Sequence, residues 1–217
     1  MRNFKFAIFD MDGTLLDSMP YWHNLGRDYL LSKGKIPQDN LIDIIRSMSM
    51  KESSKYFIDH YNIEGTVDTV INEINSFIEN QYLYEIPCKP YVKEYLENLH
   101  SQDISMCIAT ATSKDLAISA LKRNHILQYF SEIISCDETG VGKSQPDIYY
   151  LALKRIKASK AETVVFEDAL YAIETSKKAG FYTIGVYDSS CSESLEKITS
   201  VCDEYIESFK NEIDRRK

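Results

Sequence analysis

The stretch "AIFDMDGTLLDS", residues 7 to 18, decides the fold, because an apolar run ends there in two aspartates, a glycine and a threonine. Asp10 and Asp12 stand two residues apart at the end of what reads as a buried strand. Neighbouring carboxylates repel each other, and burial removes their hydration. Alone, the D-x-D-G pattern is common in simple turns. Its place at the end of a buried strand indicates that other groups at the site compensate the charge.

Further apolar runs lie along the chain, and they are continuous rather than alternating, as in strands covered on both faces. We expect strands at residues 4–9, 104–109, 132–136, 163–166 and 182–187. Helical patterns lie between most of them, at residues 91–100, 114–124, 146–156 and 169–180. The last pattern ends at Gly180, where a helix-terminating glycine belongs. This alternation predicts an α/β fold with a doubly wound parallel sheet.

One long interval carries no strand pattern. Four helical patterns fill it instead, at residues 21–33, 40–48, 51–61 and 66–85. We therefore predict a core domain of residues 1–14 and 87–217, and a small α-helical cap domain of residues 15–86. A ligand is expected in the crevice between core and cap, beyond the carboxyl ends of the strands.

Composition limits the possible partners. The formal charge of −8 and the lack of a basic stripe argue against a nucleic-acid surface. No apolar run approaches the roughly 18 residues of a membrane span. The five cysteines are widely spaced and form no C-x-x-C pair, which favours reduced thiols, and Cys107 lies in a run typical of a core. We expect a cytoplasmic monomer without membrane attachment.

Polar residues gather where the predicted strands end, at the edge where an open α/β sheet binds its ligands. They are Asp10, Asp12, Thr110, Lys143, Glu167 and Asp168. Each motif alone has a simpler explanation, as a turn, a strand end or a helix cap. Together they offer hard oxygen ligands for Mg²⁺, with a hydroxyl and an ammonium for a phosphate group. The set predicts a site for Mg²⁺ and phosphate.

The run "TGVGKS", residues 139–144, is an alternative phosphate site because it ends like a P-loop. A P-loop needs glycine five residues before Gly142, and Asp137 stands there. Pro146 also follows Lys143 too closely for the usual helix. A P-loop is therefore disfavoured.

Four motifs, "DMDGT", "IATAT", "GKSQPDIY" and "VVFEDA", resemble in this order the haloacid dehalogenase superfamily. With the helical insert after the first motif, the chain is similar to the beta-phosphoglucomutase-like phosphatases and mutases. The resemblance implies a Rossmann-like core with a helical cap. It implies that Asp10 becomes an aspartyl phosphate and that Asp12 is the general acid and base. Asp168 would bind Mg²⁺ with Asp10 and the backbone carbonyl of Asp12, and Glu167 would assist.

The same resemblance implies a phosphoryl-binding set of Thr110, the Ala111 backbone and Lys143. In the first motif, Gly13 would allow a turn that brings a backbone N–H to the phosphate. The Thr14 hydroxyl could hold that turn by a hydrogen bond.

The cap departs from the mutase pattern, in which a histidine and an arginine serve the substrate. Trp22 occupies the histidine slot, with His23 next to it, and Met50 occupies the arginine slot. Trp22 and His23 are candidate substrate contacts, although a tryptophan near a helix start also packs well. We therefore predict a Mg²⁺-dependent phosphatase of a small phosphorylated metabolite. The alternatives are a sugar phosphomutase and a non-catalytic binding protein on the same fold.

Overall fold

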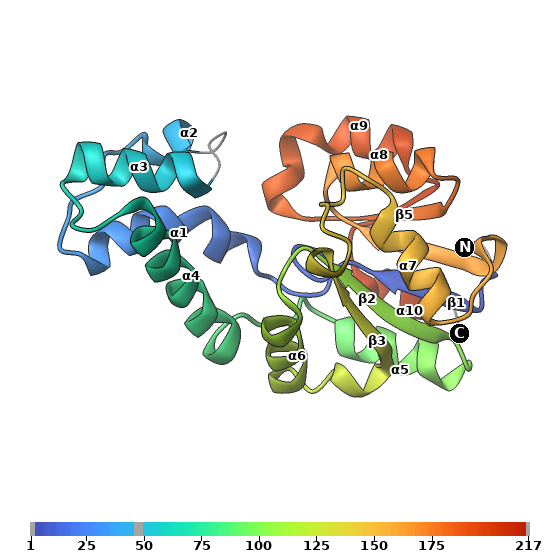
Figure 1. Cartoon of the computed structure of the whole chain (residues 1–217). Coiled ribbons are helices and arrows are strands. Elements are labelled where there is room, and N and C mark those ends of the chain that lie inside the picture. Colours follow the sequence, from blue (N-terminus) through green and yellow to red (C-terminus); the bar gives the residue numbers. More distant parts are fainter. Residues whose placement is uncertain (1–2, 46–49, 216–217) are drawn as a thin grey trace. The chain divides into compact units, whose positions relative to one another are not determined.

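A six-stranded parallel sheet forms the centre of the larger of two compact units in the chain (Figure 1). The computed structural model describes residues 3–45 and 50–215. The strand order is β3-β2-β1-β4-β5-β6, and each neighbouring pair is parallel. The strands are β1 (Phe6–Phe9), β2 (Ser105–Thr110), β3 (Phe130–Ser135), β4 (Thr163–Glu167), β5 (Tyr182–Val186) and β6 (Glu204–Ile206).

The register brings the ends of the three central strands side by side. Phe9 of β1 pairs with Ile108 of β2 and with Phe166 of β4. Asp10 continues this pairing, because its N–H donates to the Phe166 carbonyl oxygen at 2.9 Å. Since all strands run in one direction, the residues that follow them emerge at one edge of the sheet. The sheet itself thus brings Asp10 beside Glu167.

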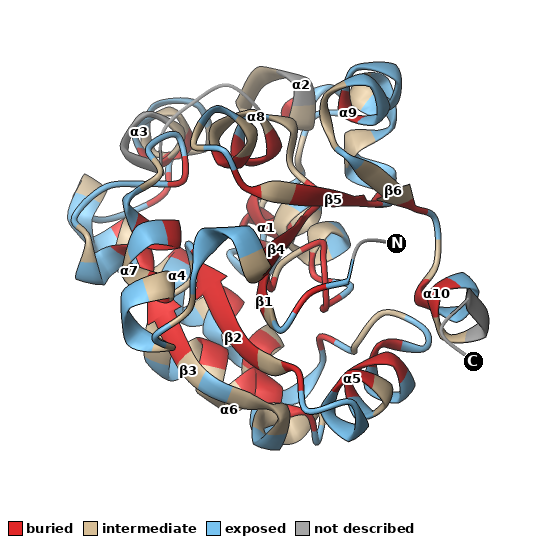
Figure 2. Ribbon diagram, turned by 90° about the vertical axis from the view of Figure 1, so that its right-hand side faces the viewer, coloured by how far each residue is buried: buried red, intermediate tan, exposed pale blue. Residues whose placement is uncertain are grey.

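Helices cover both faces of the sheet. The helices of this unit are α5 (Val92–Ser101), α6 (Lys114–Arg123), α7 (Asp147–Arg155), α8 (Leu170–Lys178), α9 (Leu195–Val201) and α10 (Phe209–Arg215). Its 3-10 helices are η1 (Leu127–Tyr129), η2 (Cys136–Glu138), η3 (Lys160–Glu162) and η4 (Ser189–Ser194). Figure 2 shows buried strands and helices whose buried sides alternate with exposed ones.

Alternate residues of the strands supply the two core layers, as the period of a strand requires. Ile8 and Val165 belong to one buried cluster with Ile148 of α7. Their chain neighbours face the other way, where Phe9 stacks on Phe166 with ring centroids 4.3 Å apart. Tyr95 of α5 meets Phe166 edge-on at 6.0 Å, and also contacts Phe209 of α10 at 5.1 Å. Burial on both faces explains why these strands read as continuous apolar runs.

The second compact unit, Pro20–Glu85, is helical. Its helices are α1 (Met19–Ser32), α2 (Leu41–Ile45), α3 (Met50–Tyr61) and α4 (Val67–Tyr84). Tyr29 of α1 stacks against Phe57 of α3 with ring centroids 5.9 Å apart. Its hydroxyl donates to Glu73 of α4 at 2.6 Å, and Lys33 pairs with the same carboxylate at 2.7 Å. Thr66 caps α4 by accepting a hydrogen bond from the Thr69 N–H.

The predicted fold class is confirmed: the chain has an α/β fold with a parallel sheet and a helical segment. The five predicted strands lie within about two residues of their expected limits. β6, α9 and α10 were not predicted. β6 has three residues and only one of them is buried, so it lacks a continuous apolar run. The roles of the two units as catalytic core and cap stay predictions.

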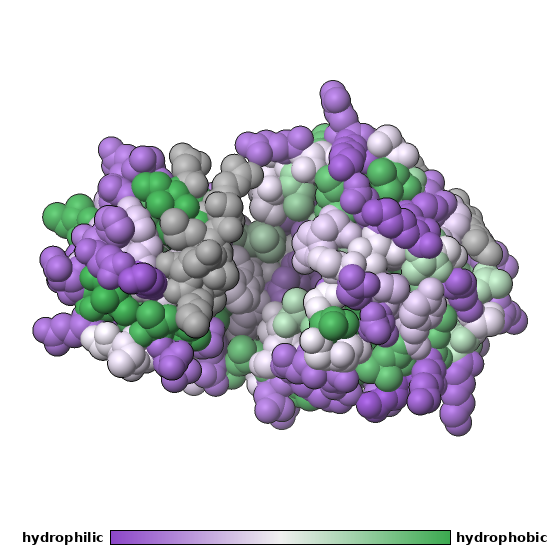
Figure 3. Space-filling view, turned by 45° about the horizontal axis from the view of Figure 1, so that its top comes forward, coloured by the Kyte–Doolittle hydropathy of each residue, from purple (hydrophilic) through white to green (hydrophobic). Residues whose placement is uncertain are grey.

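Surface and thiol properties agree with the composition. Figure 3 shows hydrophilic residues spread over the visible faces of both units, with smaller apolar areas between them. All five cysteines are free thiols, and Cys107 is fully buried in the core, as predicted. Among the helices of the described residues, none combines the length and the apolar character that crossing a membrane requires.

Candidate active site

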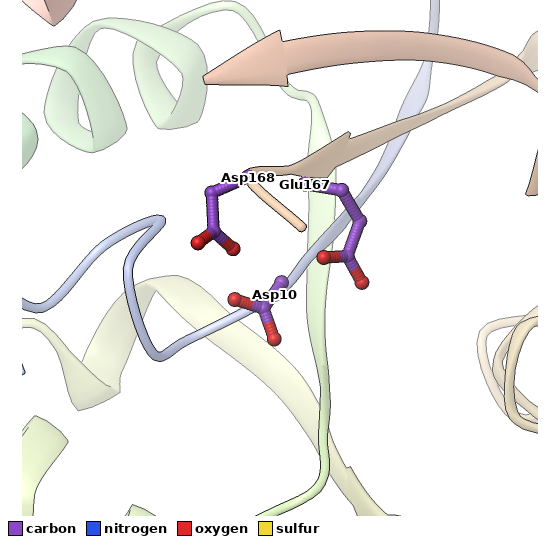
Figure 4. Close-up of side chains that lie close together, drawn as sticks. All are labelled: Asp10, Glu167 and Asp168. Atoms are coloured by element: carbon purple, nitrogen blue, oxygen red, sulfur yellow. The ribbon is translucent and has the colours of Figure 1, made fainter. Parts of the chain in front are cut away.

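Three buried carboxylates meet at the ends of β1 and β4. One oxygen of each of Asp10, Glu167 and Asp168 lies within 4.8 Å of the others, and the side chains point toward one another (Figure 4). These residues are only 6%, 1% and 3% exposed. Like charges at this separation, away from water, are costly unless they are compensated. We call these three residues the acidic triad.

A single lysine supplies part of the compensation. Lys143, in the loop before α7, is 4% exposed. Its Nζ forms an ion pair with Asp10 Oδ1 and another with Glu167 Oε1 at 2.6 Å. Burial alone would lower the pKa of Lys143, but the Asp10 and Glu167 carboxylates outweigh it and hold the pKa well above its usual value. Lys143 is therefore a permanent cation at this site.

The acidic triad keeps an excess of negative charge despite this lysine. Burial, followed by the Asp10 and Glu167 charges, raises the pKa of Asp168 well above its ordinary value. Burial also raises the pKa of Glu167, to about 7, although Lys143 acts in the opposite direction. Both carboxylates thus favour protonation unless another positive charge is present.

The triad fits a hard divalent cation. Asp10 Oδ2 is buried and, within the described part of the chain, has no hydrogen-bond partner. A buried carboxylate oxygen without a partner is costly, and a metal ion can supply the missing interaction. Carboxylate oxygens are the ligands that Mg²⁺ prefers.

The phosphate-binding candidates lie at the same edge of the sheet. Thr110 is the last residue of β2 and is fully buried, and its Oγ1 accepts a hydrogen bond from the Thr112 N–H at 3.0 Å. Ala111 follows and is exposed. Asp12 is half-buried, and its Oδ2 accepts a hydrogen bond from the Thr112 hydroxyl at 2.7 Å. The Asp12 carboxylate does not belong to the acidic triad.

The turn after β1 depends on a glycine. Gly13 has a φ of +80°, and a Cβ at this position would lie 2.3 Å from Asp168 Oδ2. The Thr14 hydroxyl donates a hydrogen bond to Asp168 Oδ1 at 3.3 Å. Backbone bonds close the turn, from the Leu15 and Leu16 N–H groups to the Met11 carbonyl at 2.9 and 2.8 Å. Thr14 thus orients a carboxylate of the triad.

Replacing Gly13 should therefore damage the site directly. In Gly13→Ala, the methyl group must displace the Asp168 carboxylate, so we expect loss of most phosphatase activity and a lower thermal midpoint. Gly140→Ala is the matched control, since Gly140 has a φ of +71° but nothing lies within 4 Å of the added Cβ. The control variant has the same backbone strain, about 1 to 2 kcal/mol for a non-glycine residue at positive φ, but its added methyl group clashes with no carboxylate. Equal activity in the two variants would contradict the close approach of Gly13 to the triad.

Two side chains at the site were not predicted as functional. The Tyr149 hydroxyl donates to Glu167 Oε1 at 3.0 Å, in the buried interior of the sheet–helix interface. The helical pattern assigns Tyr149 to the core. A buried tyrosine hydroxyl usually has a hydrogen-bond partner, and this rule could have indicated the contact. Thr112 was missed because threonine in a loop carries no pattern of its own. Its hydroxyl donates a hydrogen bond to Asp12 Oδ2.

The cap candidates lie within the helical unit. Trp22 is half-buried; its Nε1 donates to the Tyr82 hydroxyl at 2.9 Å, and the two rings meet edge-on. This contact agrees with a packing role for Trp22. His23 is exposed. The Met50 side chain lies outside the described part of the structure. Substrate contact by Trp22 or His23 stays a prediction.

Known proteins share this architecture. A family model described as haloacid dehalogenase-like hydrolase matches residues 7–186. A phosphorylated carbohydrates phosphatase of Thermotoga maritima is 29% identical over 178 residues, which cover 82% of each chain. The beta-phosphoglucomutase of Bacillus subtilis is 26% identical over 190 residues, covering 84% of this chain and 83% of that protein.

A solved structure agrees with these matches. The crystal structure of a Thermotoga maritima protein of the beta-phosphoglucomutase type superposes with a TM-score of 0.85 at 26% identity, covering 97% of this chain and 99% of that chain. The chain therefore belongs to the haloacid dehalogenase-like hydrolases, in the beta-phosphoglucomutase-like subfamily.

Proposed function

We propose that this protein is a Mg²⁺-dependent phosphatase of a small phosphorylated metabolite and acts through an aspartyl phosphate on Asp10. The observation that carries the proposal is the acidic triad, buried beside Lys143, with an oxygen on Asp10 that has no hydrogen-bond partner among the described residues. A carboxylate acts as a nucleophile only while it is ionised. Lys143 supports that state by its ion pair with Asp10.

Asp10, Asp168 and the backbone carbonyl of Asp12 would hold Mg²⁺, with Glu167 assisting. When bound, Mg²⁺ draws negative charge from the phosphoryl oxygens and lowers the barrier to attack. Lys143 also faces the phosphoryl group and stabilises the charge that develops on it.

The remaining phosphoryl oxygens need donors that are already in place. The Thr110 hydroxyl, at the end of β2, and the N–H of Ala111, which follows it, are the groups we assign to them. Because the chain carries a formal charge of −8, the phosphate must be held by these local contacts rather than by a general positive field.

Asp12 is the proposed general acid and base. It gives a proton to the leaving oxygen while Asp10 attacks phosphorus, and later takes one from the water that hydrolyses the aspartyl phosphate. Acid and nucleophile need different pKa values, and different environments can separate those of neighbouring carboxylates. The position of the Asp12 side chain outside the triad supports this division of roles.

Phosphorylated carbohydrates are the substrate class that we favour. The Thermotoga maritima relative is named for that activity and shares 29% of aligned residues with this chain. A sugar phosphomutase is the second candidate, because the Bacillus subtilis relative is a beta-phosphoglucomutase. A mutase must grip the second phosphate of its intermediate, and methionine in place of the arginine cannot do so by charge. Losing one charge-assisted hydrogen bond of about 1.5 to 3 kcal/mol weakens such a grip by roughly 10- to 100-fold.

The test sets hydrolysis against isomerisation. We expect the protein to release inorganic phosphate in a screen of sugar, nucleotide and polyol phosphates with Mg²⁺. We expect no appreciable conversion of β-glucose 1-phosphate to glucose 6-phosphate, even when the reaction is primed with the bisphosphate. Efficient isomerisation with little phosphate released would contradict the phosphatase assignment and favour the mutase.

Metal binding should also be visible without any substrate. In EDTA we expect the thermal midpoint to fall as pH rises from about 5 to 8. The pKa values of Glu167, about 7, and of Asp168 are raised in the folded protein, so the folded state keeps protons that the unfolded chain has released. This stabilisation is complete below the ordinary carboxyl pKa and is lost as pH rises through the folded value.

Mg²⁺ competes with those protons, so the gain in thermal midpoint on adding it should be larger near pH 8 than near pH 5. A change of about 1 kcal/mol shifts the midpoint by about 2 to 4 °C in a chain of this size. Glu167→Gln should flatten the decline measured in EDTA. An unchanged thermal midpoint on adding Mg²⁺ near pH 8 would contradict the proposal that Mg²⁺ is the cofactor.

A further inference from the structure

The Asp12 side chain is held by a group that the mechanism above does not use. Its Oδ2 accepts a hydrogen bond of 2.7 Å from the Thr112 hydroxyl, although the two residues lie 100 positions apart in the chain. Asp12 is half-buried in the turn after β1. A carboxylate in a turn has several rotamers of similar energy, and one short bond to a fixed donor selects among them.

The backbone N–H and the backbone carbonyl oxygen of Thr112 are both hydrogen-bonded. Its N–H donates to Thr110 Oγ1 at 3.0 Å. Its carbonyl oxygen accepts from the Ser135 hydroxyl at 2.9 Å. Thr110 and Ser135 are the last residues of β2 and β3, and they are 0% and 1% exposed. The donor that reaches Asp12 is therefore tied to two buried strand ends.

Ser135 is also the N-cap residue of η2. Its hydroxyl oxygen accepts from the Asp137 N–H at 3.3 Å, and the Glu138 carboxylate accepts from the Ser135 N–H at 3.3 Å. This is a capping box, in which both ends of the turn are satisfied reciprocally. The chain of contacts from Ser135 through Thr112 to Asp12 thus begins at a buried, hydrogen-bonded turn.

We propose that Thr112 is a positioning residue, which holds the Asp12 carboxyl group in the orientation that proton exchange with the substrate requires. This inference rests on the proposed function. Thr112 changes no bond itself.

Each of the two proposed steps moves one proton, from Asp12 in the first and to Asp12 in the second. In the first step, an Asp10 oxygen bonds to phosphorus, the bond from phosphorus to the leaving oxygen breaks, and the Asp12 proton moves to that oxygen. In the second step, a water oxygen bonds to phosphorus, its proton moves to Asp12, and the bond from phosphorus to Asp10 breaks. The general acid must lie within hydrogen-bond reach of the leaving oxygen, so its orientation affects the first step.

A leaving-group comparison separates this role from a merely structural one. An alkoxide needs a proton as it leaves, whereas p-nitrophenolate is stable enough to leave without one. The experiment measures release of the alcohol in the first turnover for the best alkyl phosphate of the screen and for p-nitrophenyl phosphate. The variants are Thr112→Val, which keeps the shape but removes the hydroxyl, and Thr112→Ser, which keeps the hydroxyl.

We expect Thr112→Val to slow first-turnover release of the alkyl alcohol by roughly 10- to 100-fold, since a small misplacement of a reacting group costs about that much. Release of p-nitrophenol should change less than about 3-fold. Thr112→Ser should remain close to wild type for both esters. Ser135→Ala should give a smaller loss of the same kind, because the Thr112 peptide then loses one of its two anchors.

Thr199→Val is the matched control. Its hydroxyl donates to backbone carbonyls within α9, at 3.0 Å, so it measures the cost of removing a threonine hydroxyl away from the site. We expect no difference between leaving groups in this variant. Equal losses for both esters in Thr112→Val, or a rise in KM with kcat unchanged, would overturn the positioning role.

The two levels of the proposal fail differently. If wild-type protein releases no phosphate from any ester, the proposed function is overturned and this role with it. If wild-type protein is active and Thr112→Val matches it with both esters, the role of Thr112 alone is overturned. A retained thermal midpoint and an unchanged Mg²⁺ concentration for half-maximal activity should accompany the supporting result, because the acidic triad is untouched.

Discussion

Asp10→Asn should lower kcat/KM by about 10⁴-fold or more, because the amide keeps the shape of the side chain but is not a nucleophile. The variant removes one of three clustered carboxylates and leaves Lys143 with Glu167 as its partner. We therefore expect the variant to fold. Its thermal midpoint in EDTA should lie at most a few degrees below that of wild type. Phosphate release and thermal unfolding, measured on the same samples, check both statements.

Asp115→Asn is a suitable control for Asp10→Asn, since Asp115 is exposed in the first turn of α6. It should keep wild-type activity. Residual activity of Asp10→Asn within about tenfold of wild type corresponds to only about 1.4 kcal/mol of transition-state stabilisation. Such a result would move the chemistry away from Asp10.

Lys143→Met should destabilise the protein and abolish most activity together. The variant leaves the buried carboxylates of Asp10 and Glu167 without the cation that pairs with them. Breaking a buried ion pair costs about 3 to 5 kcal/mol. The thermal midpoint in EDTA should fall by roughly 6 to 20 °C. Adding Glu167→Gln to this variant should restore part of the midpoint, because one of the uncompensated charges is removed.

Asp168→Asn should differ from Lys143→Met in its thermal midpoint and in its response to Mg²⁺. It removes a like charge, so the midpoint in EDTA should not fall, and the loss of a metal ligand should raise the Mg²⁺ concentration needed for half-maximal activity. Excess Mg²⁺ should recover part of the activity of Asp168→Asn and none of that of Lys143→Met. Identical Mg²⁺ dependence in the two variants would show that one of these residues has been given the wrong role.

The meeting of the three residues of the acidic triad could be predicted from the sequence. Its members directly follow or end continuous apolar runs, and parallel strands present their carboxyl ends at one edge. The pairing of Phe9 with Phe166 then makes the approach of Asp10 to Glu167 a matter of sheet register. Lys143 could be predicted as a partner because it follows β3, the strand before β4 in the chain, at the same edge of the sheet.

The sequence was not sufficient for contacts that depend on loop conformation. The Thr112 hydroxyl donates to Asp12, and the Thr112 backbone is itself bonded to the Thr110 and Ser135 hydroxyls. Tyr149 carries a core pattern, and its bond to Glu167 follows from the exact placement of α7 on the sheet. Hydroxyl groups have no periodicity, so such contacts come from the three-dimensional structure alone.

The nucleophile, the metal ligands and the phosphate donors can be tested together by one structure of the protein with Mg²⁺ and beryllofluoride, a mimic of the aspartyl phosphate. We expect beryllium bonded to an Asp10 carboxylate oxygen, with Mg²⁺ on Asp10 and Asp168, and the fluorides within reach of Lys143 and the Thr110 hydroxyl. Beryllofluoride bound only in the loop of residues 139–144, with the Asp10 carboxylate unmodified, would contradict the aspartyl-phosphate mechanism.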